Sequence, residues 1–217
     1  MFYWIKTNAL VKKLLFRYVW DIPNDEKTVY LTFDDGPTPQ VTEWVLSQLK
    51  KYQAEATFFC IGNNIEKYPD IYSKIIVDGH SIGNHTFDHL NGWKTSKTQY
   101  LDNVALCEKK IQKYENTSEN NDGAKLFRPP YGRTKPSQAK VLREKGYQII
   151  MWDVLSADFD RTISPKQCLE NVLKHVQSGS IIVFHDSVKA FPNLEYTLPR
   201  TLEFLSKNKY NCKAIRL

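Results

Sequence analysis

The chain has 217 residues, of which 41% are apolar and 25% charged, as expected for a globular protein of one domain. Its 30 Lys and Arg exceed its 24 Asp and Glu, for a formal charge of +6. The basic residues, Lys12 and Lys13 among them, are spread over apparent helices as solvated faces. No basic block is interleaved with aromatic side chains, so we expect no nucleic-acid partner.

The first 20 residues combine apolar and basic side chains. Basic residues such as Lys6 and Arg17 interrupt the apolar runs, so the segment cannot span a bilayer and lacks the apolar core of a signal peptide. Helical spacing of the apolar residues predicts an amphipathic extension over residues 1–25, followed by a domain over 26–217. Such a helix packs on its own domain more often than it lies at a membrane interface, and residues 1–20 allow both interpretations.

From about residue 28 onward, short β-rich runs alternate with longer helical patterns. The expected strands are residues 28–33, 56–61, 80–85, 126–129, 147–154, 180–184 and 212–217. The expected helices lie near residues 40–52, 64–78, 97–114, 136–145, 165–177 and 195–207. This alternation predicts a parallel sheet, either open and doubly wound or closed into a barrel. Residues 116–123, which contain a glycosylation sequon, are expected to form a surface loop.

Polar side chains gather where the expected strands end. They are Asp34, Asp35, His85, His89, Arg128, Asp153, Asp158, His185 and Asp186. The carboxyl ends of parallel strands face one side of an α/β sheet, which is where ligands bind. We therefore expect these side chains to converge on a single site.

The pair Asp34-Asp35 and the sequence His85-x-x-x-His89 together indicate a metal site. An i,i+4 pair of histidines places two imidazoles on one helical face, the spacing that grips a divalent metal. On its own this spacing also occurs in surface or capping histidines, and an Asp-Asp pair before Gly-Pro also forms turns. In combination they favour one aspartate as the third metal ligand, with the other free to act as a base.

The sequence resembles the NodB-homology polysaccharide deacetylases, carbohydrate esterase family 4. The resemblance rests on "TFDDGP" (32–37), "HTFDH" (85–89), "RPPYG" (128–132) and "IIVFHD" (181–186), and it extends from about residue 28 to the C-terminus. It implies an α/β fold, a distorted (β/α)7 barrel of parallel strands. It also implies metal-dependent removal of acetyl groups, most of all N-acetyl groups, from a glycan such as peptidoglycan or a chitin-type polymer.

The resemblance also implies roles for individual residues. Asp35, His85 and His89 would bind the metal. Asp34 would be the general base, held by Arg128, and His185 would be the general acid. Asp158 would pair with His185 and raise its pKa. The backbone N–H of Tyr131 would stabilise the oxyanion, and Trp152 would line the pocket or pack in the core.

The fourth motif of the family usually reads DxxDW, and here the segment differs. Leu155 replaces the first Asp and Phe159 replaces the Trp, while Asp158 remains. These replacements affect the shape of the substrate site more than the chemistry.

The ligand set also predicts the cofactor. Zinc suits two imidazoles and one carboxylate, and cobalt or nickel fit a similar geometry. We expect an N-acetylated glycan as substrate and a monomeric protein. With no cleavable signal visible, we expect a location in the cytoplasm or at the periphery of the inner membrane. The alternatives are an amidase of the same fold acting on a small non-sugar amide, and a non-catalytic carbohydrate-binding relative.

Overall fold

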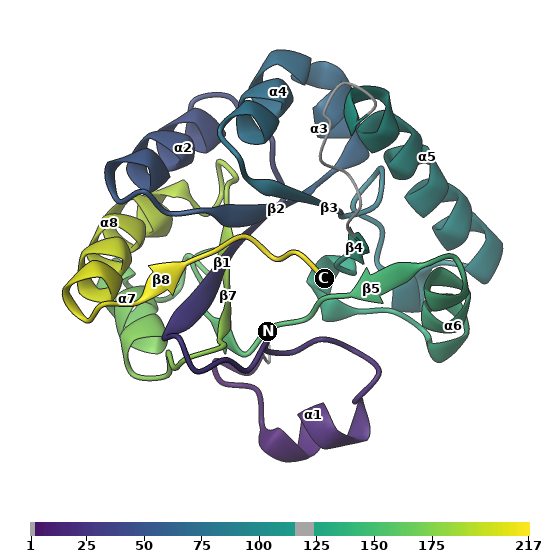
Figure 1. Cartoon of the computed structure of the whole chain (residues 1–217). Helices are drawn as coiled ribbons and strands as arrows, with labels where there is room; N and C mark the ends of the chain where they lie inside the picture. The colour runs from purple at the N-terminus through teal and green to yellow at the C-terminus, as the bar shows by residue number, and fades with distance from the viewer. Residues whose placement is uncertain (1–2, 116–123) are drawn as a thin grey trace.

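The computed structural model describes residues 3–115 and 124–217, and its strands form a curved parallel sheet (Figure 1). The strands follow the order β5-β4-β3-β2-β1-β7-β6, and β8 pairs with the start of β1. They are β1 (Thr28–Asp34), β2 (Ala56–Cys60), β3 (Ser81–Asn84), β4 (Lys125–Phe127), β5 (Tyr147–Ile149), β6 (Val154–Leu155), β7 (Ile181–His185) and β8 (Asn211–Cys212). The distorted barrel is confirmed. The loop expected at residues 116–123 lies outside the described residues.

Helices cover the outer side of this sheet (Figure 1). They are α2 (Val41–Lys51), α3 (Gly62–Lys67), α4 (Pro69–Val77), α5 (Lys97–Glu115), α6 (Pro136–Glu144), α7 (Pro165–Leu173) and α8 (Phe191–Lys207). The helix expected at residues 64–78 is therefore two helices. Tyr68 leaves the helical conformation, and Pro69, which has no N–H to donate, begins the second helix in its first turn.

A row of aromatic side chains sets the register of the central strands. Phe33 of β1 stacks on Phe58 of β2 and on Phe184 of β7, with ring centroids 5.1 and 5.8 Å apart. All three rings are fully buried. The same register pairs Asp34 with His185 across β1 and β7. Packing on one face of the sheet thus brings the predicted base and acid to neighbouring strand ends.

The N-terminal segment contains the expected helix, α1 (Ala9–Leu14), but most of it is extended chain packed on the barrel. Val19 N–H donates to the carbonyl of Ile149 at 2.8 Å, and Met151 N–H donates to the carbonyl of Val19 at 2.7 Å. The single strand expected over residues 147–154 is therefore broken into β5 and β6. Between them the chain pairs with the N-terminal segment, a contact that local sequence does not specify.

A buried carboxylate ties this segment to the barrel. Asp153 is fully buried and forms ion pairs with Lys6 at 2.6 Å and Lys12 at 2.5 Å. It also accepts a hydrogen bond from the Ser180 hydroxyl at 2.6 Å, and Lys12 pairs with Asp21 as well. Lys12 therefore points inward, which corrects the expectation that it lies on a solvated face. The domain boundary at residues 25 and 26 stays a prediction.

The four cysteines are free thiols. This agrees with the sequence, in which no two cysteines have CxxC spacing. Among the described residues, no helix is long and apolar enough to cross a membrane.

Candidate active site

Three side chains converge closely enough to hold a metal ion. The ligand atoms of Asp35, His85 and His89 all lie within 4.8 Å of one another. Asp35 Oδ1 is 3.2 Å from His89 Nε2 and 3.7 Å from His85 Nε2. Ligands on a tetrahedral zinc, at bonds of about 2.0 Å, lie about 3.3 Å apart. Asp35 Oδ1 is buried and receives no hydrogen bond from the part of the chain that the structure describes, so these residues fit a divalent cation.

The protonation of these groups also suits a metal. Burial raises the pKa of Asp35, but the contact with His89 and the charge of His185 lower it well below its ordinary value. Burial lowers the pKa of His85 to about 4, so its imidazole is neutral near pH 7. An ionised carboxylate beside a neutral imidazole is the state in which both groups bind metal.

Hydrogen bonds on the far side of each ring orient the two imidazoles. His85 Nδ1 lies 2.7 Å from the carbonyl of Arg128, which can only accept, so Nδ1 carries the proton and Nε2 is free. His89 Nδ1 lies 3.1 Å from the hydroxyl of Tyr131, and the two rings meet edge to face. Such partners fix the ring and its tautomer in metal sites.

The expectation that the two histidines share a helical face is wrong. They lie on a loop after β3, in which Thr86 and His89 have positive φ angles of 64° and 55°. Backbone N–H groups of this loop donate to the side-chain oxygens of Asn84 and Asn103. The loop conformation, rather than a helix, brings the centroids of the His85 and His89 rings to 5.1 Å from each other.

A buried ion pair fixes the predicted base. Arg128 is fully buried, and its Nη1 donates to Asp34 Oδ1 at 2.7 Å and to Thr32 Oγ1 at 2.7 Å. Its other nitrogens donate to backbone carbonyls of residues 150–151 at 3.2 and 2.9 Å. The guanidinium lies over the Phe59 ring, 4.1 Å from its centroid. The contacts hold the Asp34 carboxylate in one orientation.

Sequence reasoning missed Thr32 in this arrangement. Its hydroxyl accepts from Arg128 and donates to the carbonyl of Ile182 at 2.8 Å. Residues two apart on a strand share a face, so the spacing of Thr32 and Asp34 is the signal that could have found it.

The predicted acid also has an ionic partner. Asp158 accepts from His185 Nδ1 at 2.8 Å and from the His185 backbone N–H at 2.8 Å. Burial by itself lowers the pKa of His185, but the charge and hydrogen bond of Asp158 raise it to about 9. The imidazole is therefore protonated at neutral pH. The ring of Phe159 meets it edge to face at 5.0 Å.

The other predicted residues lie around this centre. Tyr131 belongs to a short 3-10 turn, has a φ of 60°, and its backbone N–H has no acceptor among the described residues. The half-buried Trp152 ring packs under this turn, where a Cβ on Gly132 would come within 2.6 Å of it. Leu155 of β6 is buried against Ala157 and Val183 and contributes no polar group.

Asp186, whose role the sequence left open, supports the turn that carries Asp35. Its carboxylate accepts from the Gly36 backbone N–H at 3.0 Å and from the Thr42 hydroxyl at 2.6 Å. A Cβ on Gly36 would lie 2.0 Å from Asp186 Oδ2, so only glycine fits there. Burial raises the pKa of Asp186 to about 8.

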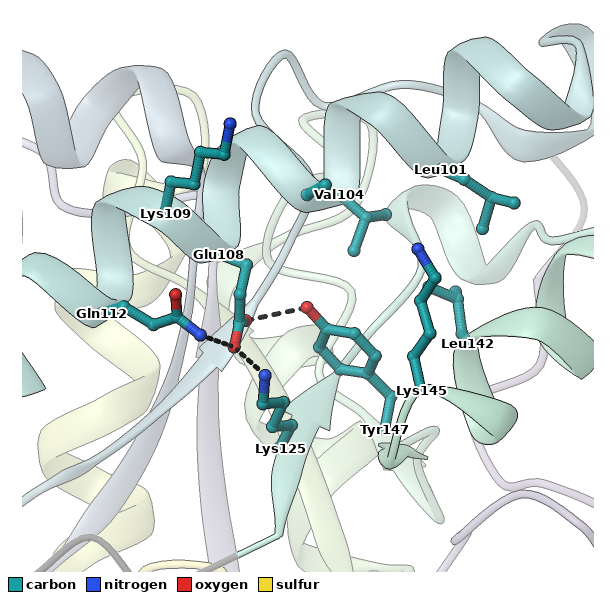
Figure 2. Close-up of a pocket in the computed structure, with 10 residues that line it drawn as sticks. Leu101, Val104, Glu108, Lys109, Gln112, Lys125, Leu142, Lys145 and Tyr147 are labelled. Atoms are coloured by element: carbon teal, nitrogen blue, oxygen red, sulfur yellow. Dashed lines mark hydrogen bonds and ion pairs between the residues drawn. The ribbon is translucent and has the colours of Figure 1, made fainter.

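A separate surface pocket lies between α5, α6 and β5 (Figure 2). None of the predicted site residues lines it. Its central carboxylate, Glu108, is bound by Tyr147 at 2.8 Å, Lys125 at 2.9 Å and Gln112 at 3.2 Å, as Figure 2 shows. The polar groups around Glu108 therefore satisfy one another, and the pocket lies apart from the candidate active site.

Comparison with known proteins agrees with this geometry. Residues 21–150 match the family model described as polysaccharide deacetylase. A peptidoglycan-N-acetylglucosamine deacetylase of Bacillus cereus is 35% identical over 192 residues, which are 88% of this chain and 87% of that protein. A chitooligosaccharide deacetylase of Azorhizobium caulinodans is 32% identical over 167 residues, 76% of each chain.

A solved structure is similar as well. The crystal structure of the Bc1960 peptidoglycan N-acetylglucosamine deacetylase superposes with a TM-score of 0.82 at 30% identity, covering 94% of this chain and 92% of that one. The chain belongs to the polysaccharide deacetylase family of hydrolases.

Proposed function

We propose that the chain removes the acetyl group from an N-acetylated sugar of a peptidoglycan or chitin-type glycan. The observation that carries this proposal is the pairing of Asp34 with Arg128 and of His185 with Asp158 beside one metal-binding cluster. A carboxylate held for proton transfer and a protonated imidazole are the two groups that amide hydrolysis requires. Relatives named for peptidoglycan and chitooligosaccharide favour a glycan over a small amide.

The cluster of Asp35, His85 and His89 would hold the cofactor. Two imidazoles and one carboxylate leave positions open, as in catalytic zinc sites, so zinc is the metal we propose, with cobalt and nickel as substitutes. A divalent metal there supplies polarisation of the acetyl carbonyl and makes a water molecule more acidic.

The chain's own residues then move the protons. Asp34, held by Arg128, accepts a proton as the water oxygen forms its bond to the acetyl carbon. The Tyr131 backbone N–H donates to the acetyl oxygen as negative charge develops there. When the carbon–nitrogen bond breaks, His185 gives its Nε2 proton to the amine, because Asp158 occupies Nδ1. The products are acetate and the free amino sugar.

Acetate release from chelated enzyme tests the proposal. The substrates are N-acetylchitooligosaccharides, peptidoglycan fragments and acetylated xylan, each with and without added zinc or cobalt. We expect metal-dependent acetate from at least one N-acetylated glycan. We also expect Asp34→Asn and His185→Ala each to lower turnover by a factor of about 10² to 10⁴. Near-normal turnover of metal-loaded Asp34→Asn would refute the base assignment. No acetate from any glycan, with metal bound, would refute the deacetylase.

We also propose that the enzyme acts as a monomer, because every side chain invoked above comes from one chain. Light scattering at working concentrations measures this. A stable dimer would contradict it.

A further inference from the structure

Exposed apolar side chains are concentrated on the N-terminal segment. Five of the twelve large hydrophobic residues exposed among the described residues lie between Trp4 and Phe16. Leu10 is 63% exposed, Leu14 70% and Phe16 73%. An exposed apolar patch of this kind marks an interaction surface. We call Leu10, Leu14, Leu15 and Phe16 the outer patch.

The arrangement of α1 explains why the patch faces outward. Val11 packs against the hydrophobic cluster around Trp20, and Lys12 reaches the buried Asp153. Leu10 and Leu14, four residues apart, lie together on another face of the helix. α1 lies outside the barrel, away from the other helices (Figure 1). The contacts of Val11 and Lys12 with the barrel therefore hold α1 in place with the outer patch facing away from the barrel.

The charge around the patch has one sign. Residues 3–20 contain four basic residues and no Asp or Glu. Lys6 and Lys12 are balanced by the two carboxylates of Asp153 and Asp21, while Lys13 and Arg17 are exposed beside the patch. The Arg17 guanidinium lies 5.7 Å from the centre of the Phe16 ring. Neither Lys13 nor Arg17 forms an ion pair with a described residue. Apolar side chains flanked by such cations match an interface of acyl chains and anionic headgroups.

We propose that the outer patch, with Lys13 and Arg17, docks the protein on the surface of an anionic lipid bilayer. The six-residue α1 is about 9 Å long, far shorter than the roughly 30 Å hydrocarbon core, so the contact is interfacial. A second copy fits less well, because a two-fold contact would bring the same cations face to face. This inference goes beyond the proposed function and does not depend on it.

The same segment also reaches the active site. The Tyr3 hydroxyl donates to Asp160 at 2.7 Å, and its ring packs against Phe159 at 5.4 Å. Phe159 in turn contacts His185. The N-terminal segment therefore contacts a neighbour of His185 at its start and carries the outer patch further along the chain.

Co-sedimentation with vesicles tests the proposal on the full chain. The vesicles are phosphatidylcholine alone and phosphatidylcholine with phosphatidylglycerol at 7:3, at low and high salt. We expect binding to the anionic vesicles, weakening as salt rises. The variant Leu14→Glu/Phe16→Glu should lower the partition coefficient at least about tenfold. The matched control Val77→Glu/Leu106→Glu, with the same charge change at exposed sites elsewhere, should bind as the parent does.

A second variant separates charge from folding. Lys13→Gln/Arg17→Gln keeps the apolar patch and should weaken binding to anionic vesicles roughly fivefold per residue. Circular dichroism checks that each variant is folded. Equal partition into both vesicle types, or unchanged binding of the Leu14→Glu/Phe16→Glu variant, overturns the proposal. A third outcome would also overturn it: the parent protein binds no vesicles but forms a dimer, and the Leu14→Glu/Phe16→Glu variant is monomeric. Acetate release from a soluble substrate should be unchanged in the Leu14→Glu/Phe16→Glu and Lys13→Gln/Arg17→Gln variants. Failure of the docking proposal can therefore be told apart from failure of the proposed deacetylase activity, which Asp34→Asn tests.

Discussion

The two neighbouring aspartates at the end of β1 serve different partners because the backbone turns between them. Asp34 is the last strand residue and shares a face with Thr32, so it meets Arg128 inside the barrel. Asp35 has a φ of 81°, and this turn directs its carboxylate to His85 and His89. The repulsion between adjacent carboxylates is offset by the Arg128 guanidinium at Asp34 and by the charge of the protonated His185 near Asp35.

Replacing Asp158 by Asn should change the pH dependence of catalysis. The carboxylate raises the pKa of His185 to about 9, so the parent should lose kcat/KM as the pH rises through about 9. In Asp158→Asn this decline should move at least about one unit toward the ordinary histidine value. A pH series of kcat/KM measures it, with the exposed Asp102→Asn as control. If kcat/KM declined at the same pH in Asp158→Asn and in Asp102→Asn, Asp158 would not be the group that raises the pKa of His185.

The same carboxylate should set part of the pH dependence of stability. Because the pKa of His185 is raised in the folded protein, its protonated form stabilises the fold. This contribution is complete below about pH 6.5 and is lost as the pH rises through about 9. Urea denaturation of the parent and Asp158→Asn across this window should converge at high pH.

Replacing Arg128 by Met should destabilise the fold as well as the site. The change leaves the buried Asp34 carboxylate without its cation, which costs about 3–5 kcal/mol in the free energy of unfolding. Urea denaturation measures the loss. The exposed Arg161→Met should change stability by no more than about 0.5 kcal/mol. Equal effects of the two variants would show that the Arg128–Asp34 pair is not structurally important.

At the scale of elements, the altered fourth motif falls on β6. Leu155 is 3% exposed among Ala157, Val183 and Ile5, and its N–H donates to the carbonyl of Ile5. An apolar residue therefore suits this strand as it is packed here. Restoring the family's Asp at this position would bury an unpaired carboxylate.

We therefore expect Leu155→Asp to be unstable rather than more active. It should lower the free energy of unfolding by about 3 kcal/mol or more, with no gain in kcat. Denaturation and acetate release measure the two effects, and Val77→Asp at an exposed site should be near neutral. A stable variant with higher turnover would mean that Leu155 limits catalysis.

The sequence predicted the helices and strands better than the places where they break or give way to a loop. Local pattern and motif spacing predicted that Asp34, His85 and His185 lie at strand ends, and the structure places them there; their catalytic and metal-binding roles stay predictions. The break at Tyr68 and the loop around His89 depend on positive or irregular dihedral angles that apolar periodicity does not report. The contribution of Thr32 depends on an arginine 96 residues away.

At the scale of the whole molecule, the N-terminal segment is part of the barrel. Its backbone pairs with residues on either side of the β5–β6 break, and its lysines neutralise Asp153. Sequence periodicity could predict its helix but not this docking, because the partners lie 141 and 147 residues away.

Replacing Asp153 by Asn should loosen this segment without unfolding the barrel. Burial raises the pKa of Asp153, but the hydrogen bonds and charges of Lys12 and Lys6 lower it more, so the ionised form stabilises the fold. This contribution is present above about pH 4 and is lost as the pH falls through the lowered pKa. Hydrogen exchange at the Val19 and Met151 amides should be faster in the variant, and exchange in β1 unchanged. Uniform acceleration would show that the segment is not a separate unit.

Left-handed backbone conformations surround the site. Nine described residues other than glycine have positive φ, and Asp35, Thr86, His89, Tyr131 and Ala157 are five of them. Each such residue is less stable than a glycine in the same conformation by about 1–2 kcal/mol. A laboratory selection for heat resistance alone would thus favour glycine or asparagine at these five positions. Because Asp35, His89 and Tyr131 belong to the candidate active site, such a selection would remove the proposed activity while the hydrophobic core stayed unchanged.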